Sequence, residues 1–103
     1  MKIVAVTSCA TGIAHTYMAA EALERAAKAA GHEVWVETQG AGGDKPLDQE
    51  GVSAADVIIF ANDVGIRGRE RFDGLKVVQS TPKEAIKNAK ALVAAAEEMV
   101  SGG

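Results

Sequence analysis

The chain has 103 residues, of which 48% are hydrophobic and 24% charged, with one Cys, one Trp and a formal net charge of -3 at pH 7. This length allows a single domain with one core, and the negative charge argues against a nucleic-acid surface, which needs clustered Lys and Arg. One cysteine excludes an internal disulfide, and no spacing of Cys and His resembles a metal site. No apolar run approaches the ~20 residues that span a bilayer. We therefore expect a cytoplasmic protein that holds no metal.

The first half of the chain begins with an apolar run at residues 2–7, which predicts a strand. Residues 15–30 place charged and small apolar side chains on separate stripes, which predicts an amphipathic helix packed on a sheet. Gly31 is expected to end this helix. Residues 33–37 alternate, with Trp35 on the side opposite its two valine neighbours, and this pattern is typical of an edge or half-buried strand.

A glycine-rich loop from Gln39 to Asp44 follows, and its composition resembles that of a nucleotide-binding loop. A dinucleotide-binding glycine loop, however, follows the first strand of its fold and opens directly into a helix. This loop leads instead through Lys45 and Pro46, and the chain has no GxxxxGK[ST] pattern. We therefore interpret the loop as a turn and expect no bound cofactor.

The second half of the chain continues the alternation of strands and helices. Residues 47–54 can form a short helix, and the continuous apolar run at 56–61 predicts a central strand buried on both faces. Residues 65–72 predict another short helix, and residues 75–79 predict a fourth strand. A long helix is expected to begin at the capping box of residues 81–84, which has proline at its first helical position.

Together these elements predict one α/β domain over residues 1–103, in which residues 101–103 form a frayed, disordered tail. The expected architecture is a three-layer open sheet of Rossmann-like or flavodoxin-like type, with four parallel strands and helices on both faces. Right-handed crossovers make 2-1-3-4 the economical strand order. The turn after the first strand then lies at the switch point where open α/β sheets bind ligands.

That turn contains the only cysteine, Cys9, just before the predicted helix. A helix N-terminus stabilises a thiolate and attracts phosphate, because its N–H groups are unpaired and its dipole is positive there. The hydroxyls of Thr11 and Thr16 could donate hydrogen bonds to the same anion. The backbone N–H groups expected to form a nest around a phosphoryl group are those of Ala10, Thr11, Gly12, Ile13 and Ala14. The turn therefore predicts a phosphocysteine at Cys9.

The spacing of this turn can be compared with the Cys-x5-Arg-[Ser/Thr] loop of protein tyrosine phosphatases, because His15 and then Thr16 follow Cys9 at the matching positions. The arginine that clamps a phosphoryl group through two charge-assisted hydrogen bonds is missing. A histidine supplies at most one such bond, so the turn favours accepting and passing on a phosphoryl group over hydrolysis. We expect His15 to contact the phosphoryl group or to hold Cys9 as a thiolate.

The segment SCATGIAHTYMAAEAL, together with VETQG at Val36 to Gly40, resembles the fructose-family IIB domain of the bacterial phosphoenolpyruvate-dependent sugar phosphotransferase system over essentially the whole chain. The resemblance implies that Cys9 takes a phosphoryl group from a phosphohistidine of the IIA domain. It implies further that Cys9 donates the group to a sugar, fructose or a related hexose, that enters through the membrane IIC domain. The family turn has proline after the cysteine, where this chain has Ala10, and the change adds one N–H group to the nest.

Two other functions remain open from the residues themselves. One is a relative of the low-molecular-weight phosphatases, which turnover of an aryl phosphate would reveal. The other is a non-catalytic regulatory module, which failure of every phosphorylated IIA domain to modify Cys9 would favour. We leave Asp63 out of the site, because a carboxylate after a strand is typical of a turn and opposes a nearby thiolate. His32 is expected to be a solvated turn residue.

Overall fold

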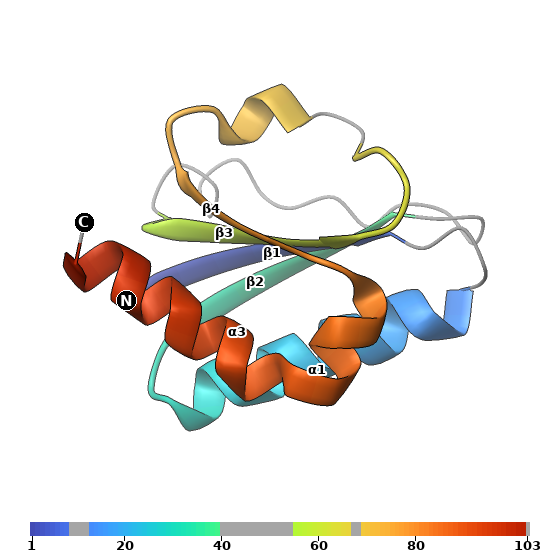
Figure 1. The fold of residues 1–103 in the computed structure, drawn as a ribbon, viewed down its shortest axis with the longest axis horizontal. Helices are drawn as coiled ribbons and strands as arrows, with labels where there is room; N and C mark the ends of the chain where they lie inside the picture. The colour runs from blue at the N-terminus through green and yellow to red at the C-terminus, as the bar shows by residue number, and fades with distance from the viewer. Residues whose placement is uncertain (9–12, 40–54, 67–68, 103) are drawn as a thin grey trace.

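The computed structural model describes residues 1–8, 13–39, 55–66 and 69–102 (Figure 1). Its elements in chain order are β1 (Lys2–Ser8), α1 (Ile13–Ala29), β2 (Glu33–Gln39), β3 (Val57–Asn62), the short 3-10 helix η1 (Arg69–Phe72), β4 (Lys76–Ser80) and α3 (Pro82–Gly102). All four predicted strands are confirmed. The predicted helix at 65–72 is confirmed only at its end, as η1, and the short helix predicted at 47–54 lies outside the described residues. Neither of the two long helices is both long and apolar enough to cross a membrane.

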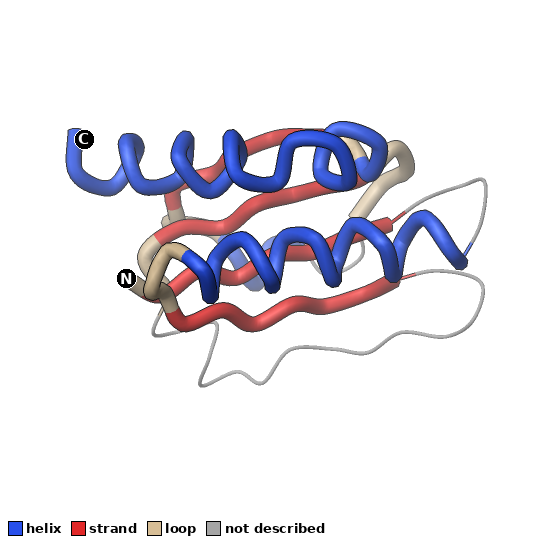
Figure 2. Tube along the Cα trace, turned by 90° about the horizontal axis from the view of Figure 1, so that it is seen from below, coloured by secondary structure: helices blue, strands red, loops and turns tan. Residues whose placement is uncertain are grey.

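The four strands form one parallel sheet in the order β2-β1-β3-β4, as predicted. Both long helices, α1 and α3, cover the same face of this sheet. Figure 1 shows them below the sheet, and Figure 2, seen from below, shows them side by side in front of it. On the opposite face, the part of the chain that the structure describes contributes the short helix η1. Helices were expected on both faces. In the described part of the chain, one face carries the two long helices and the other carries only the short helix η1.

Two apolar clusters, one on each face, hold the sheet between its neighbours. On the helical face, buried side chains of β1 and β3 pack against α1 and α3, and Leu23 and Val93 are among the fully buried residues of those helices. On the opposite face, Phe60 meets Phe72 of η1 edge to face, with ring centroids 5.7 Å apart. β3 contributes to both clusters, which confirms that it is buried on both sides. Trp35 packs on the second cluster and its valine neighbours on the first, as the alternation predicted.

Helix α3 begins at the predicted cap, since the Glu84 backbone N–H donates to the Thr81 Oγ1 at 3.2 Å. The Glu84 carboxylate does not complete a reciprocal capping box in the described contacts; it accepts a hydrogen bond from Asn88 Nδ2 at 2.9 Å. Asn88 has non-helical angles (φ -133, ψ 42), so α3 is kinked at this residue. The helix continues to Gly102, and Ser101 donates to the Glu97 carbonyl oxygen, so the first two residues of the predicted tail belong to α3.

Removal of the Thr81 hydroxyl tests the contribution of this cap. We expect Thr81→Ala to lower the free energy of unfolding by about 1 kcal/mol, because the Glu84 N–H loses the hydroxyl oxygen that accepts its hydrogen bond. Urea denaturation measures the change. Ser101→Ala removes an exposed hydroxyl at the other end of the same helix and should change stability by less than about 0.5 kcal/mol. Equal losses in the two variants would contradict a specific role for the cap.

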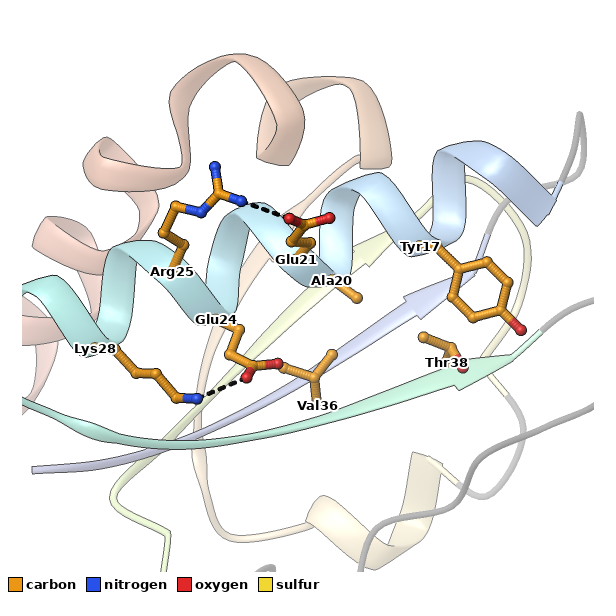
Figure 3. Close-up of a pocket in the computed structure, with 8 residues that line it drawn as sticks. All are labelled: Tyr17, Ala20, Glu21, Glu24, Arg25, Lys28, Val36 and Thr38. Carbon is orange, nitrogen blue, oxygen red and sulfur yellow. Dashed lines mark hydrogen bonds and ion pairs between the residues drawn. The ribbon is translucent and has the colours of Figure 1, made fainter.

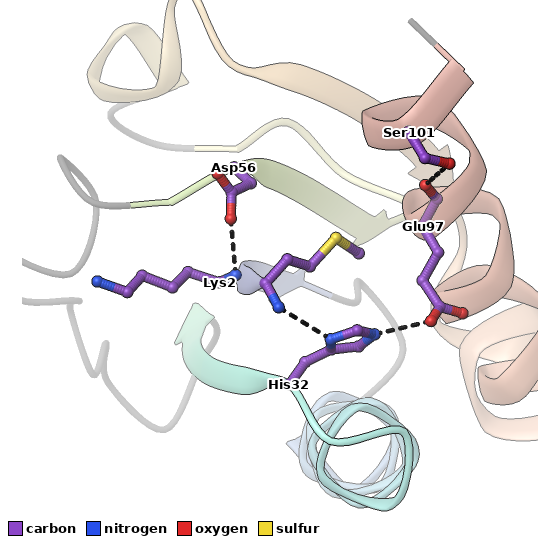
Figure 4. A network of polar contacts seen from close by, with 6 residues as sticks. Lys2, His32, Asp56, Glu97 and Ser101 are labelled. Carbon is purple, nitrogen blue, oxygen red and sulfur yellow. Dashed lines mark hydrogen bonds and ion pairs between the residues drawn. The ribbon is translucent and has the colours of Figure 1, made fainter.

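His32 lies at the amino-terminal edge of the sheet, where it joins two distant parts of the chain (Figure 4). Its Nδ1 is 3.1 Å from the Met1 amino group, and its Nε2 is 2.9 Å from Glu97 Oε2 on α3. Beside it, the Lys2 backbone N–H donates to Asp56 Oδ2 at 2.8 Å. The side chain of His32 is only 13% exposed, so the expectation of a solvated turn residue was wrong. The polar partners come from residues far away in sequence, which explains why the turn after α1 did not reveal them.

Candidate functional site

The carboxyl ends of the four strands meet at one edge of the sheet, because all of the strands run in parallel. The register places Ser8, the last residue of β1, beside Gln39 of β2 and Asn62 of β3. The Asp63 backbone N–H donates to the Ser8 carbonyl oxygen at 3.1 Å, which ties the end of β1 to the bend after β3. Ser8 is the residue before Cys9, so the cysteine is joined to the centre of this edge, as the strand order predicted.

The predicted phosphate-binding residues fall partly within the described structure. Cys9, Ala10, Thr11 and Gly12 lie outside the described residues. Ile13, Ala14 and His15 are the first three residues of α1, and their side chains also lie outside the description. The helix therefore starts at Ile13, two residues earlier than its periodicity predicted. Its first turn contains no acidic residue, so no carboxylate from that turn competes with an anion for the positive end of its dipole.

Thr16 is the one predicted contact whose side chain the structure describes. It is 3% exposed, and its carbonyl oxygen accepts a hydrogen bond from Thr7 Oγ1 at 3.1 Å. Thr38 lies beside Thr7 in the register of β1 and β2, so the three threonines gather beneath the start of α1. Within the described structure, the buried hydroxyl oxygens of Thr16 and Thr38 have no hydrogen-bond partner. Each is a donor without an acceptor there, and contact of Thr16 with a phosphoryl group stays a prediction.

On the other face of the sheet, polar side chains occupy the last positions of the strands. Gln39 Nε2 donates to Glu37 Oε2 at 2.6 Å, and both side chains are buried. Across the sheet, Gln79 Nε2 donates to Asn62 Oδ1 at 2.8 Å. No functional role was predicted for Glu37 or Gln39 from the sequence. Their polar character at the end of an otherwise apolar strand was the signal that could have identified them.

A groove of about 540 Å³ runs between α1 and the edge strand β2 (Figure 3). Ala20, Val36 and Thr38 form its floor, and the ring of Tyr17 stands over Thr38 at the end nearest the carboxyl edge. Tyr17 is 49% exposed. The wall along α1 carries two ion pairs with the i,i+4 spacing that favours helices, namely Glu21–Arg25 and Glu24–Lys28. All four of these charged side chains are exposed, so each pair adds only a few tenths of a kcal/mol.

Comparison with known proteins gives consistent matches. A family model described as "PTS system, Lactose/Cellobiose specific IIB subunit" matches residues 4–95. The chain is 52% identical over 97 residues to the "PTS system fructose-like EIIB component 2" of Escherichia coli (strain K12), which covers 93% of this chain and 92% of that relative. It is 48% identical over 91 residues to the "Fructose-like PTS system EIIBC component" of the same organism, which covers 85% of this chain and 19% of that relative.

The fold comparison agrees with these sequence matches. The solution structure of the Enzyme IIB subunit of the PTS system from Escherichia coli K12 has a TM-score of 0.90 and 42% sequence identity to this chain. The match covers 98% of this chain and 94% of that one. The parallel sheet and the two long helices are therefore shared with a solved IIB structure over nearly the full length of both chains.

Proposed function

The chain belongs to the IIB family of the phosphoenolpyruvate-dependent sugar phosphotransferase system, and we propose that Cys9 is the residue that carries its phosphoryl group. IIB components of this system are phosphotransferases. The observation that carries the proposal is the place of the only thiol, between the end of β1 and the N-terminus of α1, at the carboxyl edge of a parallel sheet. Such an edge is where open α/β sheets bind phosphorylated ligands.

The proposed reaction has two transfers that balance without a cofactor. In the first, the Cys9 thiolate attacks the phosphorus of a phosphohistidine on the IIA domain; the S–P bond forms, the P–N bond breaks and the imidazole leaves. In the second, a sugar hydroxyl attacks the same phosphorus and gives up its proton to solvent; the O–P bond forms, the S–P bond breaks and the thiolate is restored. The N-terminus of α1 and the backbone N–H groups of residues 10–14 would stabilise the charge on the phosphoryl oxygens.

The proposed acceptor side is a membrane IIC domain, and the sugar is fructose or a related hexose. Support comes from the names of the relatives, which include fructose-like EIIB components and an EIIBC component, in which a IIB region is part of a longer chain. In this proposal the domain works at the cytoplasmic face of the membrane, where it exchanges phosphoryl groups with IIA and docks on IIC. The low-molecular-weight phosphatase alternative predicts repeated hydrolysis instead.

Reconstitution tests the proposal directly. The chain is incubated with phosphoenolpyruvate, the general phosphocarriers and a cognate IIA domain, and intact-mass measurement should find one added phosphate per chain. Omission of IIA is the control and should prevent labelling. An unlabelled chain in the complete mixture would contradict the proposed function and favour a regulatory module, whereas many turnovers of an aryl phosphate per chain would favour a phosphatase.

His15 is the side chain most expected to assist this transfer. Replacement by alanine should slow phosphorylation of Cys9 by roughly tenfold to a hundredfold, equivalent to one lost transition-state hydrogen bond of ~1.4 to 2.7 kcal/mol. Rapid-quench measurement with phosphorylated IIA gives the rate. His32→Ala removes the other histidine, at the opposite edge of the sheet, and should leave the rate unchanged. An unchanged rate in the His15 variant would limit that residue to a structural role.

A further inference from the structure

A second groove, of about 660 Å³, runs between the two long helices, which Figure 2 shows side by side. Its floor consists of small or aliphatic side chains of both helices. Ala26 of α1 and Ile86 and Ala89 of α3 line it, are half-buried and pack on the first apolar cluster. Because these side chains are part of the core packing, the floor of the groove is apolar and its position is fixed by the fold.

The walls of this groove carry cations on both sides, Arg25 on α1 and Lys87 and Lys90 on α3. Both lysines are exposed, and in the described part of the chain neither forms an ion pair. Two carboxylates lie close by: Glu21 pairs with Arg25, and Glu84 accepts a hydrogen bond from Asn88. Three cations against two carboxylates leave the walls positive, although the whole chain has a net charge of -3.

We propose that the groove between α1 and α3 docks an amphipathic helix of a partner protein, one that carries acidic residues on both sides of its apolar stripe. The apolar stripe would lie on the alanine and isoleucine floor, and the acidic residues would meet the cations of the two walls. Grooves with an apolar floor are a recurring binding site for such helices, and charges along the rim select the partner. The inference goes beyond the proposed function, and no step of it depends on Cys9.

The shape of the groove favours a helix over a small molecule or a membrane. Its α1 wall extends from Ala22 to Ala29, about 10 Å at a rise of 1.5 Å per residue, which is the length of two helical turns. The rim is open, since Ala29 and Ala91 are exposed, whereas a small-molecule site buries most of the surface of its ligand. A flat bilayer would touch the outer ridges of the two helices and leave the floor between them uncovered.

Titration of the isotope-labelled chain with two synthetic peptides tests the proposal by NMR. The first peptide, of about 16 residues, has leucines in an i, i+3, i+4, i+7 stripe and glutamates on both sides of it. The second has lysines in place of the glutamates. The glutamate peptide should shift the amide resonances of Ala22, Ala26 and Ala89, and the lysine peptide should bind at least about tenfold more weakly.

Charge reversal on the α3 wall separates docking in this groove from general stickiness. The double variant Lys87→Glu/Lys90→Glu should bind the glutamate peptide about tenfold more weakly than the wild type and should prefer the lysine peptide. The double variant Lys2→Glu/Lys83→Glu makes the same change in net charge at exposed positions outside the groove. It should change the affinity by less than about threefold. All four substituted side chains are exposed, and circular dichroism establishes that both variants are folded.

Three results would overturn the proposal. One is a glutamate peptide that leaves the groove resonances unshifted or shifts only residues elsewhere. The second is equal affinity for the two peptides, or a preference that Lys87→Glu/Lys90→Glu does not reverse. The third is binding of the chain to phosphatidylglycerol vesicles without any binding of the glutamate peptide, which would make the basic surface a membrane contact instead.

Discussion

A Cys9→Ser protein is expected to gain no detectable phosphate from the complete phosphoenolpyruvate relay, whereas the wild type gains one per chain. Removal of an enzyme nucleophile typically costs ~10⁶-fold in rate. A serine hydroxyl does not ionise to an alkoxide near neutral pH, and the chain contains no second cysteine to replace the first. Intact-mass measurement and radiolabel from phosphoenolpyruvate both report the loss.

The matched control is Ser8→Ala, which removes a hydroxyl from the preceding residue and keeps the thiol. This variant should still be phosphorylated if it folds, which its melting temperature reports. Phosphate on the Cys9→Ser protein at the wild-type level would contradict the prediction and would point to one of the two histidines, His15 or His32. Mapping of the acid-labile label would then distinguish between them.

Phe60→Ala should cause the largest loss of stability, about 3 to 5 kcal/mol in the free energy of unfolding. Phe60 is fully buried in the central strand β3, packs edge to face on Phe72 and carries the Arg69 guanidinium over its ring. The substitution removes both ring contacts and leaves a cavity between the sheet and η1. Because small domains are stable by only about 5 to 15 kcal/mol, a large part of the folded-state stability is at stake.

Urea denaturation with a constant m-value measures this loss. Phe60→Leu keeps most of the apolar volume and should cost markedly less than Phe60→Ala. A loss of under about 1 kcal/mol for Phe60→Ala would contradict the description of the second cluster as a packed core. The comparison of the two variants separates loss of volume from loss of the aromatic contacts.

The strands and their order were predictable because both depend on local patterns and on one chiral rule. Alternation identified the edge strand β2, continuous apolar character identified β3, and right-handed crossovers gave the order of the sheet. The arrangement of the helices on the sheet was harder to predict from the sequence. That α1 and α3 share a face depends on where the chain crosses the sheet, which periodicity within each helix does not report.

The candidate site also has a part that the sequence predicts and a part that only the structure shows. Cys9, His15 and Thr16 belong to one contiguous turn, so their spacing was visible in the sequence. Glu37 stands out because it is buried and because it pairs with Val6 of β1, which is 31 positions earlier in the chain. His32 likewise depends on Glu97, which is 65 positions away in the chain. Neither relationship has a local sequence pattern, so the structure was needed to find them.

The two ends of the described chain lie at the same end of the molecule, opposite the carboxyl ends of the strands (Figures 1 and 2). The molecule is 35 Å long in its largest dimension. A flexible linker has an r.m.s. end-to-end distance of about 5.5 Å times the square root of its length, so a linker of about 40 residues has an r.m.s. span of 35 Å. In a fusion with a membrane domain, a linker much shorter than this would restrict which way the carboxyl edge can turn, and linker length would set the local concentration of that domain at the carboxyl edge.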